Sequence, residues 1–498
     1  MKNFIKSIIP LMIVLLLFSC DSYLDELPDD RIELNSLEIA SEVVANAYSQ
    51  GSYAFTDMYT DLAGPVGNDL NGDGIADGYG GNQINPQDEQ TYTWGDVVEV
   101  GNDTPANYWN AAYEAISQAN EVLVVVDGLE GGDELRKAVK GEALLTRAYH
   151  HFILVNIFGM HYDASASTNL GVTYITKPEK EFLPQYTRNT VAEVYDLVEK
   201  DLLEGLSLIQ DDFFVGTKKY HFTVKAAQAF ASRFYLWKRD YAKCKIYSDL
   251  FLGGSPESYI KDYSSLQGLP FLETGAAYSD PADDSNALVM QQFSSYTRRT
   301  RGFRLNANDV NVLFSNVFRA SDARTSIGIF NSGTDSRYLP RLREYFFQEN
   351  LSSTTGTPYY IAVELKGEEV ILNRAEALFY LGDETAALED LNRIANNRYG
   401  GANYILDADL QDYYLVNTPQ KAFIEALLHE RKKEFWDHGL RWFDIKRYNI
   451  PITHNLPENR GNILPDLPNQ IELPANDLRR AIQIPADAIA QGLAPNPR

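Results

Sequence analysis

Apolar residues recur every three or four positions along most of the chain, a spacing that predicts amphipathic helices. Segments of this kind cover residues 36–55, 104–127, 133–158 and 191–209. Two more segments, 223–252 and 361–398, are each interrupted near the middle, which predicts a pair of antiparallel helices in each. The pattern therefore predicts a mainly α-helical protein.

Both predicted helix pairs carry small residues where their helices would meet. Ala375 and Ala387 lie twelve positions apart, and Ser232 and Cys244 repeat this spacing. The offset is typical of a tetratricopeptide (TPR) hairpin. We therefore expect helical repeats over about 36–252 and 361–447. We also expect Cys244 to be a small core residue and not a nucleophile.

The helical period is lost in three places. A Gly-rich polar insertion spans residues 64–96, residues 253–360 mix Gly, Ser, Asp and aromatics, and residues 448–498 are rich in Pro. Long irregular segments on a regular scaffold are usually functional. We expect one domain over 36–498, in which the loop-rich lobe 253–360 forms a ligand face and 448–498 wraps over the helices.

The first 19 residues have the pattern of a bacterial lipoprotein signal peptide. Two lysines precede an apolar stretch that is too short to span a bilayer, and this stretch ends just before Cys20. We expect cleavage before Cys20, lipidation of Cys20, and an acidic tether over residues 20–35. The alternative is an ordinary secreted protein with an incidental cysteine.

The charge and the motifs exclude several classes of function. A net charge of −25 argues against nucleic-acid binding. We find no H-E-x-x-H, G-x-S-x-G, phosphate loop or paired C-x-x-C. Adjacent His150 and His151 would point apart on a helix, so we expect structural roles for both. We predict that the protein is not an enzyme, with a two-carboxylate glycosidase and a TPR scaffold for protein tails as alternatives.

One piece of the first insertion has the spacing of a calcium loop. Ligand positions 1, 3, 5, 7 and 9 are filled by Asp69, Asn71, Asp73, the Ile75 carbonyl and Asp77. Position 12, where a bidentate acid is usual, is Gly80. The segment is either a structural Ca²⁺ site or an Asn/Gly-rich turn with incidental acids.

Several motifs resemble those of the SusD/RagB family of outer-membrane nutrient-binding lipoproteins. They are RAYHHFILVNIFG at 147–159, Asp322-Ala323-Arg324, the A-E-A-L at 375–378 and the block ERKKEFWDHGLRWFDIKR at 430–447. Leu440 stands where the family often has His, and the Q-N-P-G-Y ending is missing. The match covers nearly the whole mature chain.

The resemblance implies about four TPR-like helix pairs that support a loop-rich ligand face. It implies a lipid-anchored protein on the cell-surface side of the outer membrane, with no catalytic activity and no required cofactor. Such a protein captures an oligosaccharide, or peptides in a RagB-like relative, for a SusC-type TonB-dependent transporter. Most residues of these motifs are then expected to be scaffold. Arg441 and Asp444 are expected to form a buried pair or to hold main-chain carbonyl groups, and not to be a ligand site.

Sugars pack their C–H faces on flat rings and need polar partners for their hydroxyls. The candidate ligand residues are Tyr79, Asn82, Tyr92 and Trp94 in the first insertion, and Tyr278, Phe293, Tyr296, Arg298, Arg299 and Arg301 in the lobe. Trp94 is the best single candidate, with burial against the helix near residue 104 as its alternative. The arginines suggest an anionic ligand, or pairing within this acidic protein.

Overall fold

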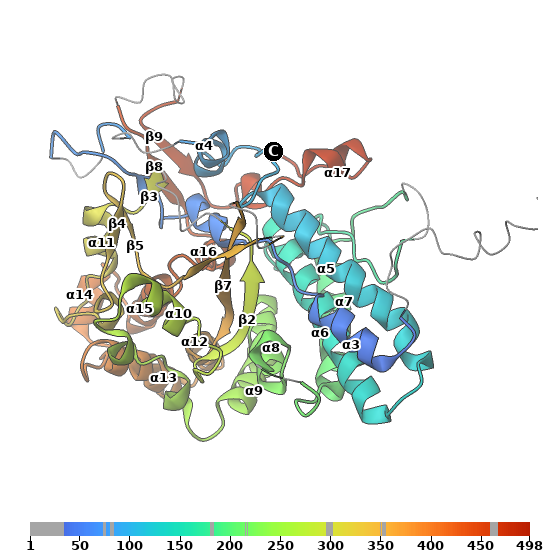
Figure 1. The fold of residues 1–498 in the computed structure, drawn as a ribbon. Coiled ribbons are helices and arrows are strands. Elements are labelled where there is room, and N and C mark those ends of the chain that lie inside the picture. The colour runs from blue at the N-terminus through green and yellow to red at the C-terminus, as the bar shows by residue number, and fades with distance from the viewer. Residues whose placement is uncertain are drawn as a thin grey trace, which may run out of the picture.

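The computed structural model describes residues 34–72, 76–79, 84–179, 184–214, 216, 218–294, 302–348, 350, 355–458 and 467–498. Several predicted features lie outside these residues: the signal peptide, Cys20, nearly all of the acidic tether, and Asp73, Ile75, Asn82, Tyr296, Arg298, Arg299 and Arg301. Helices dominate the described part, which confirms the mainly α-helical class (Figure 1).

In the described N-terminal part, the long helices are α3 (Leu37–Ala45), α5 (Pro105–Val125), α6 (Asp133–Phe158) and α7 (Val191–Leu208). The Thr104 side chain caps α5 by accepting from the Asn107 backbone N–H. Helices α6 and α7 approach closely at Gly205, where a Cβ would lie 3.1 Å from the Gly141 carbonyl oxygen. The prediction that the first helix continues to residue 55 is wrong. It ends at Ala45, and a 3₁₀ helix, η1 (Ala54–Tyr59), follows.

The two predicted hairpins are present as α8 (Val224–Lys238) with α9 (Tyr241–Leu252), and α12 (Gly367–Tyr380) with α13 (Glu384–Arg398). Asp240 and Asp383 cap the second helix of each pair. Ser232 Oγ and Cys244 Sγ lie 4.0 Å apart in the buried contact, which confirms Cys244 as a core residue. The prediction that the later hairpin begins at 361 is wrong, because its first six residues continue a strand.

The lobe contains a three-stranded antiparallel sheet in the order β2-β7-β6, formed by β2 (Asn286–Gln292), β7 (Thr357–Lys366) and β6 (Glu344–Phe347). In Figure 1, β2 and β7 stand between the N-terminal helices and the hairpin of α12 and α13. The other lobe elements are α10 (Phe271–Tyr278), α11 (Ala307–Leu313), β3 (Phe303–Arg304), β4 (Phe330–Ser332) and β5 (Ser336–Tyr338). The first insertion adds β1 (Gly64–Pro65) and α4 (Pro86–Tyr92).

The C-terminal part comprises α14 (Ala408–Tyr413), α15 (Pro419–Glu434), α16 (Arg441–Tyr448), β8 (Ile452–Asn455), β9 (Gln470–Leu473) and α17 (Ala486–Ala490). Beyond β9 the tail lies against α6 and α16. The Ile482 N–H donates to the Ile157 carbonyl oxygen, and the Arg480 guanidinium donates to the Ile445 and Ile450 carbonyls.

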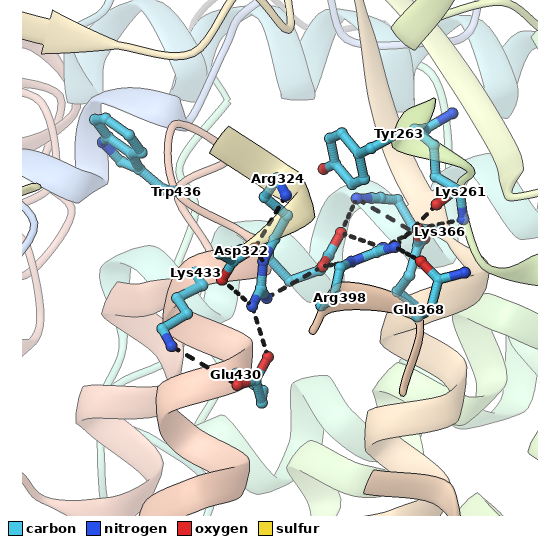
Figure 2. Close-up of polar contacts among 12 residues, drawn as sticks. Lys261, Tyr263, Asp322, Arg324, Lys366, Glu368, Arg398, Glu430, Lys433 and Trp436 are labelled. Atoms are coloured by element: carbon cyan, nitrogen blue, oxygen red, sulfur yellow. Dashed lines mark hydrogen bonds and ion pairs between the residues drawn. The ribbon is translucent and has the colours of Figure 1, made fainter. Parts of the chain in front are cut away.

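A buried ion-pair network joins the lobe to the repeats (Figure 2). Arg324 Nη2 lies 2.7 Å from Asp322 Oδ2 and 2.8 Å from Glu430 Oε2 on α15. Arg398 on α13 lies 3.0 Å from Glu368 Oε1 on α12. All five side chains are buried. The Asp322-Ala323-Arg324 motif and Glu430, the first residue of the 430–447 block, are therefore scaffold.

Arg441 and Asp444 are also buried in ion pairs, but not with each other. Arg441 Nε lies 2.8 Å from Asp61 Oδ1, and Asp444 pairs with Arg431 and Arg447 at 2.8 Å each. Their burial agrees with the expectation that neither residue is a ligand site. The pair between Arg441 and Asp444 is not formed, because each pairs with other groups of opposite charge.

Candidate functional site: an aromatic platform on the lobe sheet

Trp94 is a core residue. Its side chain is 2% exposed, its indole N–H donates to the Tyr59 carbonyl oxygen at 2.9 Å, and its ring stacks on His454 with centroids 4.3 Å apart. The expectation of an exposed ligand ring is wrong, because Tyr59 and His454 on β8 enclose the ring. The alternative of burial is correct, although the covering ring comes from β8 and not from the helix near residue 104.

Tyr92 and Tyr79 belong to the same buried stack. The Tyr92 ring lies between Phe303, at 4.2 Å, and His454, at 4.0 Å, and Tyr79 packs edge-on against Phe303. Tyr278 is also fully buried, with its hydroxyl 2.9 Å from Lys366 Nζ. These rings hold the insertion and the lobe to the core, which favours structural roles, and ligand contact by these tyrosines stays a prediction. For Asn82, Tyr296, Arg298 and Arg299, ligand contact stays a prediction.

Other aromatic side chains gather at one face of the three-stranded sheet. We call this group the aromatic platform; it consists of Phe293 just after β2, Tyr359 on β7, Tyr345 and Phe347 on β6, and Tyr220 at the end of the 3₁₀ helix η3 (Lys218–Tyr220). Only Phe293 was among the candidates from the sequence. The sequence does contain a signal for Tyr345, Phe347 and Tyr359. They lie in two runs rich in aromatic residues, REYFF (343–347) and TPYY (357–360), whose strands pair with each other.

The register of the strands explains why these rings meet. Tyr345 pairs with Tyr359, and their rings stack with centroids 5.4 Å apart at 21°. Phe293 follows Gln292, the partner of Tyr360, and its ring lies 6.2 Å from the Tyr359 ring. Cross-strand neighbours on one face interact in this way. The result is a continuous row of rings across three strands.

Part of this row faces solvent. Phe347 is 51% exposed and Tyr220 is 37% exposed, while the other platform rings are half-buried. Burial raises the pKa of Tyr220, and the nearby phenols Tyr345 and Tyr359 raise it further. The Arg343 guanidinium lies 4.9 Å from the Tyr345 ring centroid and adds a cation–π contact at the rim. The platform thus offers partly exposed apolar rings, phenolic hydroxyls and a positive charge.

Buried polar contacts fix the sheet that carries the platform. The Glu364 carboxylate on β7 accepts hydrogen bonds from the Tyr53 hydroxyl at 2.9 Å and the Tyr149 hydroxyl at 2.6 Å. It also accepts one from the Gln292 amide on β2. Arg233 on α8 donates to the Glu364 carbonyl oxygen at 2.6 Å. The strands are therefore tied to η1, α6 and α8, which holds the rings in place.

The adjacent histidines have structural roles, as predicted. His150 accepts from the Ser49 backbone N–H at 3.2 Å, and His151 accepts from the Ile175 N–H at 3.0 Å. Burial lowers the pKa of each to about 3. Across the described ranges, no group of three or more His, Cys, Asp or Glu side chains is placed to hold a metal ion.

The described part of the calcium-like loop uses its acids in local hydrogen bonds. Asp69 Oδ1 accepts from the Gly72 N–H at 2.6 Å, and Asp77 Oδ2 accepts from the Asn71 N–H at 3.2 Å. Such bonds occur in an ordinary Asx-type turn as well as in a calcium loop. Since Asp73 and Ile75 lie outside the described residues, the calcium site stays a prediction.

Comparisons with known proteins agree with the fold. Residues 22–236 match the family model described as starch-binding, associating with outer membrane, and residues 331–487 match the model of the SusD family. None of the curated proteins matches this sequence. Of the residues with described positions, none form a helix long and apolar enough to cross a membrane.

Solved structures similar to this chain include three SusD-type proteins. A SusD superfamily protein from Bacteroides thetaiotaomicron VPI-5482 shares 21% identity over 93% of this chain and 100% of its own, with a TM-score of 0.65. A SusD-like carbohydrate binding protein from Bacteroides vulgatus ATCC 8482 shares 19% identity over 92% and 97%, with a TM-score of 0.65. A laminarin binding SusD-like protein shares 15% identity over 93% and 98%, with a TM-score of 0.58. The two family models, the motifs and the fold agree: the chain belongs to the SusD/RagB family of nutrient-binding proteins.

Proposed function

We propose that this protein captures an oligosaccharide on the aromatic platform and delivers it to a SusC-type TonB-dependent transporter, without chemically changing it. The observation that carries the proposal is the row of partly exposed rings across β2, β7 and β6. Sugars present C–H faces to flat rings, and their hydroxyls hydrogen-bond to phenols and to charged side chains at the rim.

The spacing of the rings favours an extended ligand. Neighbouring centroids in the row lie 5.4 and 6.2 Å apart, so several rings form one strip instead of an isolated stacking position. A strip of this kind contacts successive units of a chain. Buried hydrogen bonds fix the sheet beneath the rings. The platform therefore loses little conformational entropy when the ligand binds.

The cellular setting belongs to the same proposal. We infer that a lipid on Cys20 anchors the protein to the outer membrane on its cell-surface side. The lipoprotein pattern of residues 1–20 supports the anchor, and the outer-membrane association named by the matching family model supports the compartment. A transporter partner follows from membership in a family that serves nutrient uptake.

A second candidate function is capture of peptides, as in a RagB-like protein. One feature favours it: within the described residues, β6 pairs only with β7 and is an edge of the sheet. An extended peptide can add to such an edge by main-chain hydrogen bonds while its side chains contact the rings.

A binding screen separates the candidates. The lipid-free mature chain carrying Cys20→Ala is applied to arrays of oligosaccharides and of peptides, beside a variant that also carries Tyr345→Ala and Phe347→Ala. We expect retention on oligosaccharides that the platform variant loses, and recovery of the ligand intact. Retention on peptides alone would favour the RagB-like function, and cleavage products would establish a glycosidase.

A further inference from the structure

A cavity of about 410 Å³ lies between α11 and the 3₁₀ helix η6 (Ala323–Thr325), away from the aromatic platform. Its floor is apolar: Val310 and Phe314 are buried in a hydrophobic cluster, and Ile329 packs against that cluster. Polar side chains that are exposed to solvent line its edge, namely Asn311, Arg319 and Ser321. The cavity therefore combines an apolar floor with hydrogen-bonding groups and a guanidinium.

The loop that carries Arg319 is held in place by a buried asparagine. Asn316 is 7% exposed, and its amide nitrogen donates to the Phe314 carbonyl oxygen at 3.3 Å and to the Ala320 carbonyl oxygen at 2.9 Å. Its amide oxygen accepts from the Ala320 N–H at 3.1 Å. The Arg319 N–H donates to the Asn316 carbonyl oxygen, also at 3.1 Å. These bonds fix the backbone of Arg319 beside the cavity.

Arg319 has an unusual backbone conformation. Its φ is 52°, in the left-handed region that favours glycine. Of the non-glycine residues that share this conformation in the described chain, all but Arg319 and Leu415 use their side chains in hydrogen bonds or ion pairs within the fold. Strained residues of this kind cluster at binding sites. An arginine here thus points to a role outside the fold.

The charge of Arg319 is not compensated. Its guanidinium makes no hydrogen bond or ion pair with any residue that the structure describes, although the chain has 69 acids and only 44 bases. Asp322 also lines the cavity, but Arg324 binds both of its carboxylate oxygens, at 2.8 and 2.7 Å. The cavity therefore presents one positive charge without a partner, which favours an anionic ligand.

We propose that this cavity is a subsite for a uronic acid residue of a saccharide, with the sugar carboxylate bound by Arg319. A guanidinium binds a carboxylate through two parallel hydrogen bonds. Asn311 and Ser321 supply partners for ring hydroxyls, and the apolar floor takes a C–H face of the sugar. The choice of a saccharide rests on the proposed function, whereas the choice of a carboxylate rests on this cavity alone.

Matched sugars and matched variants test the subsite. Glucuronate differs from glucose by a carboxylate in place of a hydroxymethyl group, and an N-acetylated dipeptide offers a carboxylate without a sugar. Their binding to the mature chain with Cys20→Ala is measured by ligand-observed NMR titration. Arg319→Gly removes the guanidinium. Arg239→Gly is the control, because Arg239 also has a positive φ, 62°, but donates to the Arg447 carbonyl oxygen.

We expect glucuronate to bind about tenfold more tightly than glucose, since only glucuronate forms the charged hydrogen bonds. Arg319→Gly should abolish this preference, and Arg239→Gly should keep it. The melting temperature of Arg319→Gly should equal or exceed that of the wild type, because glycine favours the left-handed conformation. A neutral oligosaccharide from the array should bind to Arg319→Gly as to the wild type, since the platform is unchanged.

Equal binding of glucuronate and glucose, or a preference that persists in Arg319→Gly, would overturn the subsite. If the neutral oligosaccharide still binds, the proposed function stands without it. Tighter binding of the dipeptide than of glucuronate would overturn the assignment to a saccharide. A lower melting temperature of Arg319→Gly would also contradict the proposal, because it would show that the arginine side chain stabilises the fold.

Discussion

Trp94 and Phe347 show that the residue type alone does not decide the role of an aromatic ring. Trp94 lies in an irregular insertion, as a ligand-binding ring would, but Tyr59 and His454 enclose it from distant parts of the chain. Phe347 lies on a strand, yet half of its surface is exposed because β6 is an edge strand in the described sheet. Long-range packing decides both outcomes, and no local pattern reports it.

Replacing Trp94 by Ala should therefore destabilise the fold and leave the binding surface unchanged. The substitution removes a buried ring and leaves the Tyr59 carbonyl without its donor, and we expect a loss of about 3–5 kcal/mol in the free energy of unfolding. Urea unfolding measures this loss, and calorimetry below the melting temperature should give the wild-type affinity. A variant of normal stability with weakened ligand binding would contradict this assignment.

At the scale of elements, the sequence predicts the parts whose pattern is local. The hairpins α8–α9 and α12–α13 follow from small residues at a fixed spacing and from Asp caps, and both are present. The strand β7 is not predicted from the sequence. Its residues 361–366 are largely apolar, and their pattern continues without a break into that of the helix that begins at Gly367. The sheet depends on pairing β7 with β2 across some 70 residues, information that periodicity does not contain.

The buried ion-pair network between the lobe and the repeats should make the free energy of unfolding depend on pH in the acidic range. Burial would raise the pKa of Glu430, but Arg324 and Lys433 outweigh burial and lower it from 4.5 to about 2. Ionised Glu430 therefore stabilises the fold fully above pH 4.5, and this contribution is lost as the pH falls toward 2.

Glu430→Gln tests this network. It should cost about 3–5 kcal/mol at neutral pH, since Arg324 loses a charged partner in the interior. It should also weaken the acid dependence below pH 4.5, because Gln does not titrate. Urea unfolding at pH 7, 4.5 and 3 measures both effects. An acid dependence identical to that of the wild type would show that Glu430 is not a source of it.

The loop at 69–77 should bind Ca²⁺ if its acids act together. Three carboxylates brought together on one loop would repel one another, so a cation between them would stabilise the loop and with it the fold. We expect one bound calcium per chain by metal analysis, and a melting temperature that falls by a few degrees on chelation. The matched variant Asp73→Asn should lose the metal and the response to chelator. If protein purified without chelator contains no calcium, the prediction of a calcium site is wrong.

For the whole molecule, the acyl chains on Cys20 should supply the membrane affinity, since the net charge of −25 opposes binding of the body to anionic lipid. Cys20→Ala should move the protein from the membrane pellet to the supernatant in cells that lack the transporter. The wild type should sediment with membranes and co-purify with a TonB-dependent barrel in mild detergent. A Cys20→Ala variant that still sediments would refute the lipid anchor.

The most direct test of the central claim compares two neighbouring phenylalanines on β6. Phe346 and Phe347 are both 51% exposed, but adjacent strand residues point to opposite faces, and only Phe347 belongs to the platform. Titration calorimetry with an oligosaccharide from the array should show binding weakened by more than tenfold in Phe347→Ala, since truncation of a central ring typically costs about 2 kcal/mol. Phe346→Ala should bind like the wild type. Equal affinities for both variants, or a loss only in Phe346→Ala, would contradict capture on the platform.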